Sequence, residues 1–221
     1  MANYEVPPSL LEPRLPRGTE LDLEDGRCYV SLVGFMFLDT RVRDFLVPFH
    51  INFEEVNLRF YVTHRAGEEV RRGVVFVKEI VPKTAIATVA RVLYEEPYEA
   101  HKMWNRREGD RIEYGWEEGG RAHTIGVTRG QKIGIPEVGS HAEFIIEHYW
   151  GYTRRRGGRT DEYKVEHPKW DLYERSDVKI DVDLGVVYGL DFEFLNDLDP
   201  YSVLLAAGSE IAVYKGKPLS I

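Results

Sequence analysis

Three polar side chains at alternate positions, Glu55, Asn57 and Arg59, have the types and the spacing to bind and transform a small molecule. A guanidinium can hold a carboxylate through two parallel hydrogen bonds, an amide can orient a ligand, and a carboxylate can accept a proton as a general base. We therefore expect a small, anionic or amide-bearing ligand, held by Arg59 and oriented by Asn57, with Glu55 as the candidate catalytic residue. Tyr61 extends the same row and is a further candidate for ligand binding.

The segment 53–62 predicts the strand that would position this row. Apolar and polar residues alternate along it, and a period of two is typical of a strand whose faces meet different surroundings. One face carries Val56, Leu58, Phe60 and Val62, and the other carries Phe53, Glu55, Asn57, Arg59 and Tyr61. Because Glu55 and Arg59 would lie about 13 Å apart along a strand, each needs its own partner if the polar face is buried. This face is either the lining of a cavity or a solvated surface, whose cross-strand pairs contribute at most about 1 kcal/mol each.

Length and charge limit the classes of protein to which the chain can belong. Its 221 residues suffice for one domain, residues 1–221, with a sizeable core. The 37 acidic residues against 29 Lys and Arg give a net charge of −8, which argues against nucleic acid or an anionic membrane surface as partner. The longest nearly apolar run, Val30 to Leu38, is about half the length of a membrane-spanning helix. No signal peptide is visible, so we expect a cytoplasmic protein; a homo-oligomer stays open.

Known chemical motifs are absent from the sequence. There is no phosphate-binding loop, nucleophile elbow or H-E-x-x-H pattern, so we predict no cofactor. His141 and His148 would lie about 10 Å apart on a helix, too far to share a metal ion, and we predict no metal site. The single cysteine, Cys28, excludes an intramolecular disulfide and reads as an inert, packed thiol.

Two further clusters have structural interpretations. The basic run 154–156, with Arg159, surrounds Gly157-Gly158 and indicates a hairpin tip more than a phosphate site. The aromatic residues around His148 indicate core packing at a corner between a helix and a strand more than a stacking platform.

The remaining pattern predicts a mainly β protein of the α+β class with a few short helices. The expected strands are 27–38, 53–62, 73–81, 111–116, 122–128, 150–154, 162–166 and 211–214. Glycine-containing turns at 67–69, 118–120 and 156–158 join neighbouring strands. Apolar residues at helical spacing predict a helix between Pro82 and Pro97, and Ser140-x-x-Glu143 is a capping box that starts a second helix.

The chain resembles the YqjF-like family, a domain of unknown function in the acetoacetate-decarboxylase-like superfamily. The segments that carry the resemblance extend over about nine-tenths of the chain. They are Asn3-Tyr4-Glu5-Val6-Pro7-Pro8, 15–22, 29–35, the strand 53–62, 72–82, Glu147-His148-Tyr149-Trp150-Gly151-Tyr152 and Val165-Glu166-His167-Pro168-x-Trp170.

The resemblance implies a curved antiparallel sheet that closes into a barrel-like cone, with a cavity inside and helices at its mouth. It also implies roles for two residues. Glu55 matches the position of a catalytic glutamate in the decarboxylases, and Arg91 matches an arginine on the helix that follows Pro82. A cavity would place the row that begins at Glu55 in contact with a ligand.

The chain departs from the decarboxylases at the Schiff-base lysine. Where those enzymes have a Gly-Tyr-Pro-Lys-Lys type motif, this chain reads Glu95-Glu96-Pro97-Tyr98-Glu99. If the following stretch is extended, Tyr98 and Lys102 share a face and become candidates for ligand binding. The nearby glutamates would raise the pKa of Lys102, whereas a Schiff-base lysine needs a lowered pKa, so we do not expect acetoacetate decarboxylation.

Two hypotheses from different classes remain. The first is an enzyme on a small carboxylate or carbonyl compound, with Glu55 as base and Arg59 or Arg91 holding the anion. The second is a non-catalytic binding protein that uses the same site.

Overall fold

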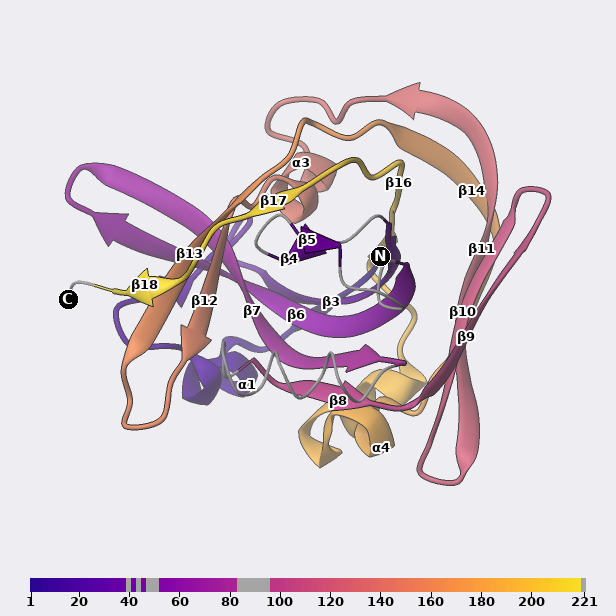
Figure 1. The fold of residues 1–221 in the computed structure, drawn as a ribbon, viewed down its shortest axis with the longest axis horizontal. Helices are drawn as coiled ribbons and strands as arrows, with labels where there is room; N and C mark the ends of the chain where they lie inside the picture. Colours follow the sequence, from indigo (N-terminus) through magenta and orange to yellow (C-terminus); the bar gives the residue numbers. More distant parts are fainter. Residues whose placement is uncertain (39–40, 43–44, 47–51, 83–95, 220–221) are drawn as a thin grey trace.

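The computed structural model describes residues 1–38, 41–42, 45–46, 52–82 and 96–219, and within these two curved sheets dominate (Figure 1). The larger sheet has eleven strands, whose main path runs β15-β1-β3-β6-β7-β12-β13-β17. Its strands are β1 (Ala2–Val6), β2 (Glu20–Leu21), β3 (Cys28–Phe37), β6 (Phe53–Ala66), β7 (Glu69–Val81), β8 (Tyr98–Ala100), β12 (Trp150–Arg154), β13 (Thr160–Glu166), β15 (Ser202–Val203), β17 (Ala212–Val213) and β18 (Lys217–Pro218).

The smaller sheet has five strands in the order β16-β14-β11-β10-β9. They are β9 (Lys102–Glu108), β10 (Arg111–Glu118), β11 (Arg121–Gly134), β14 (Leu172–Asp181) and β16 (Leu205–Ala206). Strands β4 (Arg41–Val42) and β5 (Phe45–Leu46) form a separate pair. The helices are short: α1 (Pro8–Leu11), α3 (His141–Ile146) and α4 (Leu184–Tyr188), with 3-10 turns at Glu12–Arg14 and at η2 (Leu190–Asp197).

The predicted mainly β fold is confirmed, but the predicted closure into a barrel is wrong. Among the described residues neither sheet closes on itself. The reason is visible at two points where the chain passes from one sheet to the other. His101 separates β8 of the larger sheet from β9 of the smaller sheet, and Leu204 does the same between β15 and β16. The ladder of backbone hydrogen bonds is therefore divided between two open sheets.

The predicted strands and turns are present, several with longer bounds. Strands β6 and β7 form the predicted hairpin, whose turn places Gly67 at a φ of 66°, a conformation that glycine adopts without steric cost. The sequence did not predict β1, β9, β14, α1 or α4. Strands β9 and β14 are mostly exposed and carry many charged residues, so apolar alternation gives little signal there.

The capping box is confirmed in part. The Ser140 side chain accepts a 3.2 Å hydrogen bond from the Glu143 amide, as expected for an N-cap residue. The Glu143 carboxylate accepts instead from the Gly139 amide, one residue before the cap, at 2.7 Å. The other predicted helix, between Pro82 and Pro97, falls largely on residues 83–95, which lie outside the described residues, and Arg91 lies there too.

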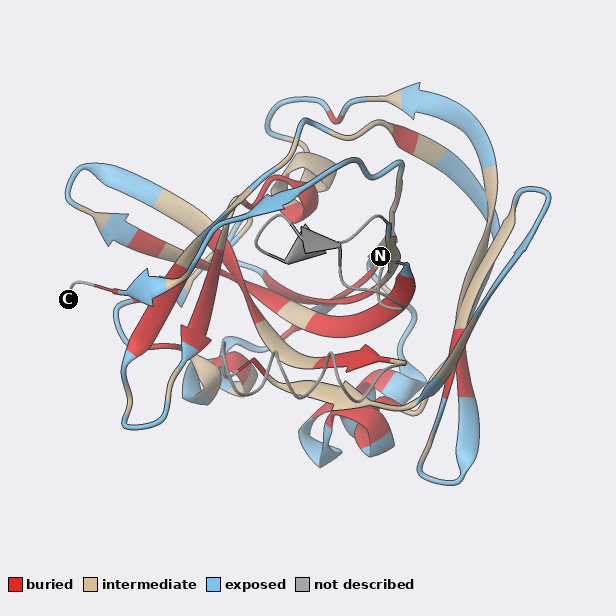
Figure 2. Ribbon diagram, viewed as in Figure 1, coloured by how far each residue is buried: buried red, intermediate tan, exposed pale blue. Residues whose placement is uncertain are grey.

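The two faces of β6 meet different surroundings, as the alternation predicted, although residues of both faces are buried. Val56, Leu58, Phe60 and Val62 belong to the main hydrophobic core, which also includes Trp116. The opposite face meets different surroundings, because Tyr61 packs in a second cluster with Ile145 and Phe53 packs in a third with Val81. Figure 2 shows burial concentrated along the larger sheet, while the ends of β9, β10 and β11 are exposed.

The structural interpretations of three sequence features also hold. Cys28 is buried, and burial raises the pKa of its thiol to about 11, which disfavours the reactive thiolate. Tyr152, next to the predicted corner, lies in the main core with its ring almost fully covered. Arg155 and Arg159, at the predicted hairpin tip, both pair with the buried Asp161, at 2.8 and 2.9 Å.

Within the described part of the chain, no helix has the length and apolar character to cross a membrane.

Candidate functional site

The polar face of β6 is covered at the end that carries Glu55 and Asn57. Both side chains belong to residues only 1% exposed, and the Asn57 amide donates to Glu55 Oε1 at 2.9 Å. The solvated alternative for this face is therefore excluded at these two positions. A buried carboxylate must find hydrogen-bond donors inside the protein or take up a proton.

Two neighbouring strands bring further acidic and phenolic groups to Glu55. Glu79 of β7 lies opposite Asn57 and is 2% exposed, and Tyr98 of the parallel strand β8 lies beside Glu79. The Tyr98 hydroxyl donates to Glu55 Oε2 at 3.2 Å and is also hydrogen-bonded to Glu79. The two carboxyls therefore share one phenol.

A third buried carboxyl comes from the segment before β8. Glu96 is hydrogen-bonded to Thr153 of β12 and to Tyr163 of β13. Its negative charge raises the pKa of both Glu55 and Glu79, which places the three carboxyls in one electrostatic environment. We call Glu55, Glu79 and Glu96, with Tyr98 and Tyr163, the acidic cluster.

Burial sets the protonation of the acidic cluster. Desolvation raises the pKa of Glu55 to about 7, against the opposing effect of hydrogen bonds from Asn57 and Tyr98. Desolvation also raises the pKa of Glu96 to about 7. The pKa of Glu79 is raised well above its ordinary range, first by desolvation and then by the charges of Glu55 and Glu96. At neutral pH the cluster therefore holds protons that exposed glutamates would have released.

Three buried polar atoms along this face have no hydrogen-bond partner among the described residues. They are Asn57 Oδ1, Arg59 Nε and Glu79 Oε2. Nearly all buried polar atoms in native proteins have a hydrogen-bond partner. The unpartnered atoms on this face of β6 and on the neighbouring strand β7 therefore need an explanation. Asn57 Oδ1 is an acceptor and Arg59 Nε is a donor, whereas Glu79 Oε2 can accept or donate depending on whether its carboxyl holds a proton.

The other end of the row is basic. The Arg59 guanidinium lies over the Tyr61 ring at 5.7 Å, and its Nη2 is 3.6 Å from Met1 Sδ. The Tyr61 hydroxyl is 2.5 Å from Ser31 Oγ. Arg59 and Glu55 do not form an ion pair in the described structure, as their spacing along the strand predicted, although the charge of Arg59 lowers the pKa of Glu55.

Lys102 does not join this group. Its side chain is 75% exposed and pairs with Glu117 at 2.7 Å. The expected continuation of one face from Tyr98 to Lys102 fails because His101 separates β8 from β9, which belong to different sheets. The structure thus brings together Glu55, Asn57 and Tyr98, places Arg59 and Tyr61 farther along the same face, and leaves Lys102 outside.

Sequence reasoning missed Glu79, Glu96 and Tyr163. Counting back from the β6–β7 turn would pair Asn57 with Lys78, because the first part of the hairpin pairs Ala66 with Glu69 and Arg59 with Phe76. A β-bulge between Leu58 and Arg59 shifts the register by one residue and places Glu79 opposite Asn57. No sequence signal marks this bulge, and none links Glu96 to Tyr163 across sixty-seven positions.

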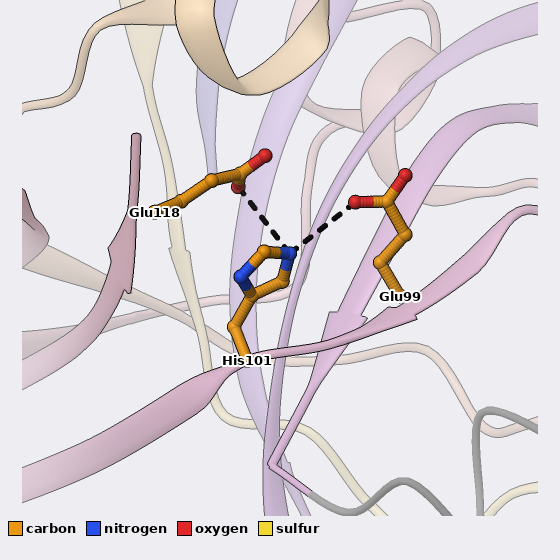
Figure 3. A group of neighbouring side chains, drawn as sticks. All are labelled: Glu99, His101 and Glu118. Atoms are coloured by element: carbon orange, nitrogen blue, oxygen red, sulfur yellow. Dashed lines mark hydrogen bonds and ion pairs between the residues drawn. The ribbon is translucent and has the colours of Figure 1, made fainter. Parts of the chain in front are cut away.

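A separate group, Glu99, His101 and Glu118, contains metal-ligating residue types (Figure 3). His101 Nε2 is 3.2 Å from Glu99 Oε2 and 3.7 Å from Glu118 Oε2. Lys78 Nζ lies 3.0 Å from Glu99 and 3.1 Å from Glu118, so an ammonium group already balances these carboxylates. The absence of a metal site stays a prediction, and this group gives no positive support for one.

Comparison with known proteins agrees with this architecture. The family model DUF2071, described as "Uncharacterized conserved protein", matches residues 1–210. The protein YqjF of Bacillus subtilis (strain 168), described as uncharacterized, is 26% identical over 185 residues, which cover 82% of this chain and 74% of YqjF.

Two solved structures share the fold at low sequence identity. The enduracididine biosynthesis enzyme MppR complexed with pyruvate superposes with a TM-score of 0.63 at 14% identity, covering 99% of this chain and 86% of MppR. Acetoacetate decarboxylase from Legionella pneumophila gives a TM-score of 0.59 at 14% identity, covering 99% and 83% of the two chains. The chain therefore has an acetoacetate-decarboxylase-like fold.

Proposed function

Because the chain belongs to the DUF2071 family and has an acetoacetate-decarboxylase-like fold, we propose that it binds a small carbonyl-containing carboxylate along the polar face of β6 and moves a proton on it. The observation that carries the proposal is the combination of a buried Glu55, whose pKa is about 7, with unpartnered polar atoms on the same face. A general base works best when its pKa lies near the working pH.

Binding would use both ends of the row. Arg59, whose Nε has no partner in the described structure, lies about 13 Å along the strand from Glu55, so it would hold the carboxylate of a ligand long enough to reach along the row. Glu79 Oε2, on a carboxyl whose pKa is raised well above its ordinary range, would donate a hydrogen bond to an oxygen of the ligand. One structural relative supports this class of ligand, because MppR was solved with pyruvate, a small 2-oxoacid.

The proposed reaction is proton transfer next to a carbonyl group. Ionised Glu55 would take the proton from the neighbouring carbon, and the electron pair of the C–H bond would move toward the carbonyl oxygen. Protonated Glu79 would donate a hydrogen bond to that oxygen, since its pKa is raised well above its ordinary range, while the Tyr98 hydroxyl keeps its hydrogen bond to Glu55. Returning the proton from Glu55 completes the cycle without a lysine.

Hydrogen–deuterium exchange on a 2-oxoacid tests this proposal directly. Pyruvate, 2-oxobutyrate and the longer 2-oxoglutarate are incubated with the protein in D2O, and loss of the C–H signal next to the carbonyl is followed by NMR. We expect exchange above the buffer rate with at least one of them, and a loss of about 100-fold or more in Glu55→Gln. Lys102→Ala, on an exposed residue, is the matched control and should exchange at the wild-type rate. Exchange at the buffer rate with all three, or full activity in Glu55→Gln, would contradict the catalytic proposal.

The second candidate function is binding without catalysis, which the same unpartnered atoms favour. A ligand that binds only the folded state raises the melting temperature once its concentration exceeds its dissociation constant. A 2-oxoacid that raises the melting temperature without exchange would select this alternative. In that case Arg59→Ala should remove the shift, and a shift that persists would refute the role given to Arg59.

A further inference from the structure

A second group of side chains, outside the acidic cluster, has the order of a nucleophile, a base and an orienting acid. Ser202 Oγ lies 2.7 Å from His141 Nε2, and His141 Nδ1 lies 2.6 Å from Glu24 Oε2. We propose that Ser202, His141 and Glu24 form a hydrolytic triad that cleaves small carboxylic esters. Triads of this kind are recognised by geometry and roles, because their members occur in any order along a chain.

The hydrogen-bond partners fix the direction of each contact. His141 Nδ1 faces a carboxylate, which can only accept when ionised, so this nitrogen carries the hydrogen and Nε2 of the neutral ring is the acceptor. Ser202 Oγ accepts a 2.8 Å hydrogen bond from Asn3 Nδ2, which leaves its own hydrogen for His141 Nε2. This is the arrangement in which a histidine removes the serine proton.

The triad is assembled from three distant parts of the chain. Ser202 begins β15, His141 begins α3, and Glu24 lies in the turn before β3. The Tyr29 hydroxyl is hydrogen-bonded to Glu24 and supports the orienting acid. The His141 ring packs in T-shaped contacts against both Tyr29 and Tyr201, with each centroid 5.1 Å away, so its orientation is constrained.

A buried network holds the nucleophile from behind. Asn3, opposite Ser202 in the pairing of β1 with β15, is fully buried, and its Oδ1 accepts from Ser31 Oγ at 2.6 Å. Ser202 is half-buried, whereas the side chains of His141 and Glu24 are 22% and 18% exposed. All three residues have intermediate exposure, so the group is shielded more than a surface pair but is not sealed from solvent.

The chemistry balances with water as the only other reactant. Ser202 Oγ would bond to the ester carbon while His141 Nε2 takes the hydroxyl proton. The bond to the ester's alcohol oxygen would then break, and that oxygen would receive the proton from His141. Water, activated by the same nitrogen, would release the acid and restore Ser202.

Labelling with a fluorophosphonate tests the nucleophile, because such reagents react with activated serines. The purified chain is treated with diisopropyl fluorophosphate, and the modified serine is located by peptide mass spectrometry. We expect modification of Ser202, none at that position in Ser202→Ala, and a rate about 100-fold lower in His141→Gln. Hydrolysis of p-nitrophenyl acetate should show a burst of product that disappears in Ser202→Ala.

Two variants separate a nucleophile from a structural contact. Ser209→Ala removes an exposed serine whose Oγ accepts from Trp170, and it should label at the wild-type rate. Glu24→Gln keeps the size of the orienting residue, and we expect its labelling rate to be at least about 10-fold lower than that of the wild type. This variant decides the test if circular dichroism shows that His141→Gln is unfolded. The proposal would be overturned if Ser202 were not modified. It would also be overturned if a folded His141 or Glu24 variant were labelled at the wild-type rate. Neither outcome bears on 2-oxoacid exchange at Glu55.

Discussion

The Tyr98 hydroxyl donates a 3.2 Å hydrogen bond to Glu55 Oε2 and is also hydrogen-bonded to Glu79, so one phenol connects two buried carboxyls. The phenol's own pKa is raised well above 10 by burial and by these two charges. It therefore stays a hydrogen-bond donor throughout the neutral range. This hydrogen bond favours the ionised form of Glu55, whose pKa is about 7, whereas the pKa of Glu79 is raised well above its ordinary range.

The acidic cluster should make the protein less stable as pH rises. The pKa of Glu55 is about 7 in the folded protein and about 4.5 in an unfolded chain, so the folded state binds more protons between these values. The contribution of Glu55 to the free energy of unfolding is complete below pH 4.5 and is lost as pH rises through about 7. We expect the unfolding free energy, measured by urea titration, to fall between pH 5 and pH 8. In Glu55→Gln this fall should be smaller by roughly 1–3 kcal/mol. Glu117→Gln, on an exposed side chain, should keep the wild-type pH dependence, and parallel curves for Glu55→Gln would contradict the shifted pKa.

His148 should act in the opposite direction at acidic pH. Burial lowers its pKa to about 4, although the hydrogen bond from Nε2 to Asp22 at 3.2 Å opposes this shift. The unfolded chain then binds more protons between pH 6.5 and 4, and stability is lost as pH falls through this window. We expect His148→Asn to reduce the loss of unfolding free energy between pH 6.5 and pH 4.5 in urea titrations, whereas His167→Asn, at a half-buried position, should leave that loss unchanged. An equal loss in both variants would show that His148 is not held neutral.

Gly73 should be intolerant of a side chain because β7 and β12 approach closely there. A Cβ at this position would lie 2.6 Å from the Trp150 carbonyl oxygen and 2.6 Å from the Tyr152 ring. We expect Gly73→Ala to destabilise the protein by about 2 kcal/mol or more in urea titrations, since packed surroundings cannot relax freely. Gly216→Ala is the control, because its Cβ would have no neighbour closer than 3.6 Å. Equal effects of the two substitutions would argue against the parallel pairing of Trp150 with Gly73.

Lys102 should not form an imine with a ketoacid. Its amine is exposed and paired with Glu117, and it lacks the desolvation that activates a Schiff-base lysine. After borohydride reduction in the presence of acetoacetate, peptide mass spectrometry should find Lys102 unmodified. Lys102→Ala should change the unfolding free energy by less than about 1 kcal/mol, as expected for a surface ion pair. A reduced adduct on Lys102 would restore the decarboxylase-type reaction to consideration.

Local sequence determined the parts of this protein that depend on neighbouring residues. Alternation from Phe53 to Val62 predicted β6 and its two faces, because side chains on a strand alternate whatever the rest of the fold does. The turn at Gly119 and Gly120, with φ of 58° and 79°, was predictable for a similar reason, since few other residues adopt this conformation freely. Alternation alone therefore placed Glu55 and Asn57 on one face of the strand, where their side chains are hydrogen-bonded to each other.

Tertiary structure alone decided which groups surround Glu55 and Asn57. The β-bulge beside Leu58 places Glu79, and not Lys78, opposite Asn57, and a one-residue shift of register exchanges a cation for a carboxyl. The passage between sheets at His101 separates Tyr98 from Lys102, which simple alternation had joined. The sequence by itself determined a polar strand face. The pairing of strands far apart in the chain buried it and supplied the carboxyls, and that burial raises the pKa of Glu55 to about 7.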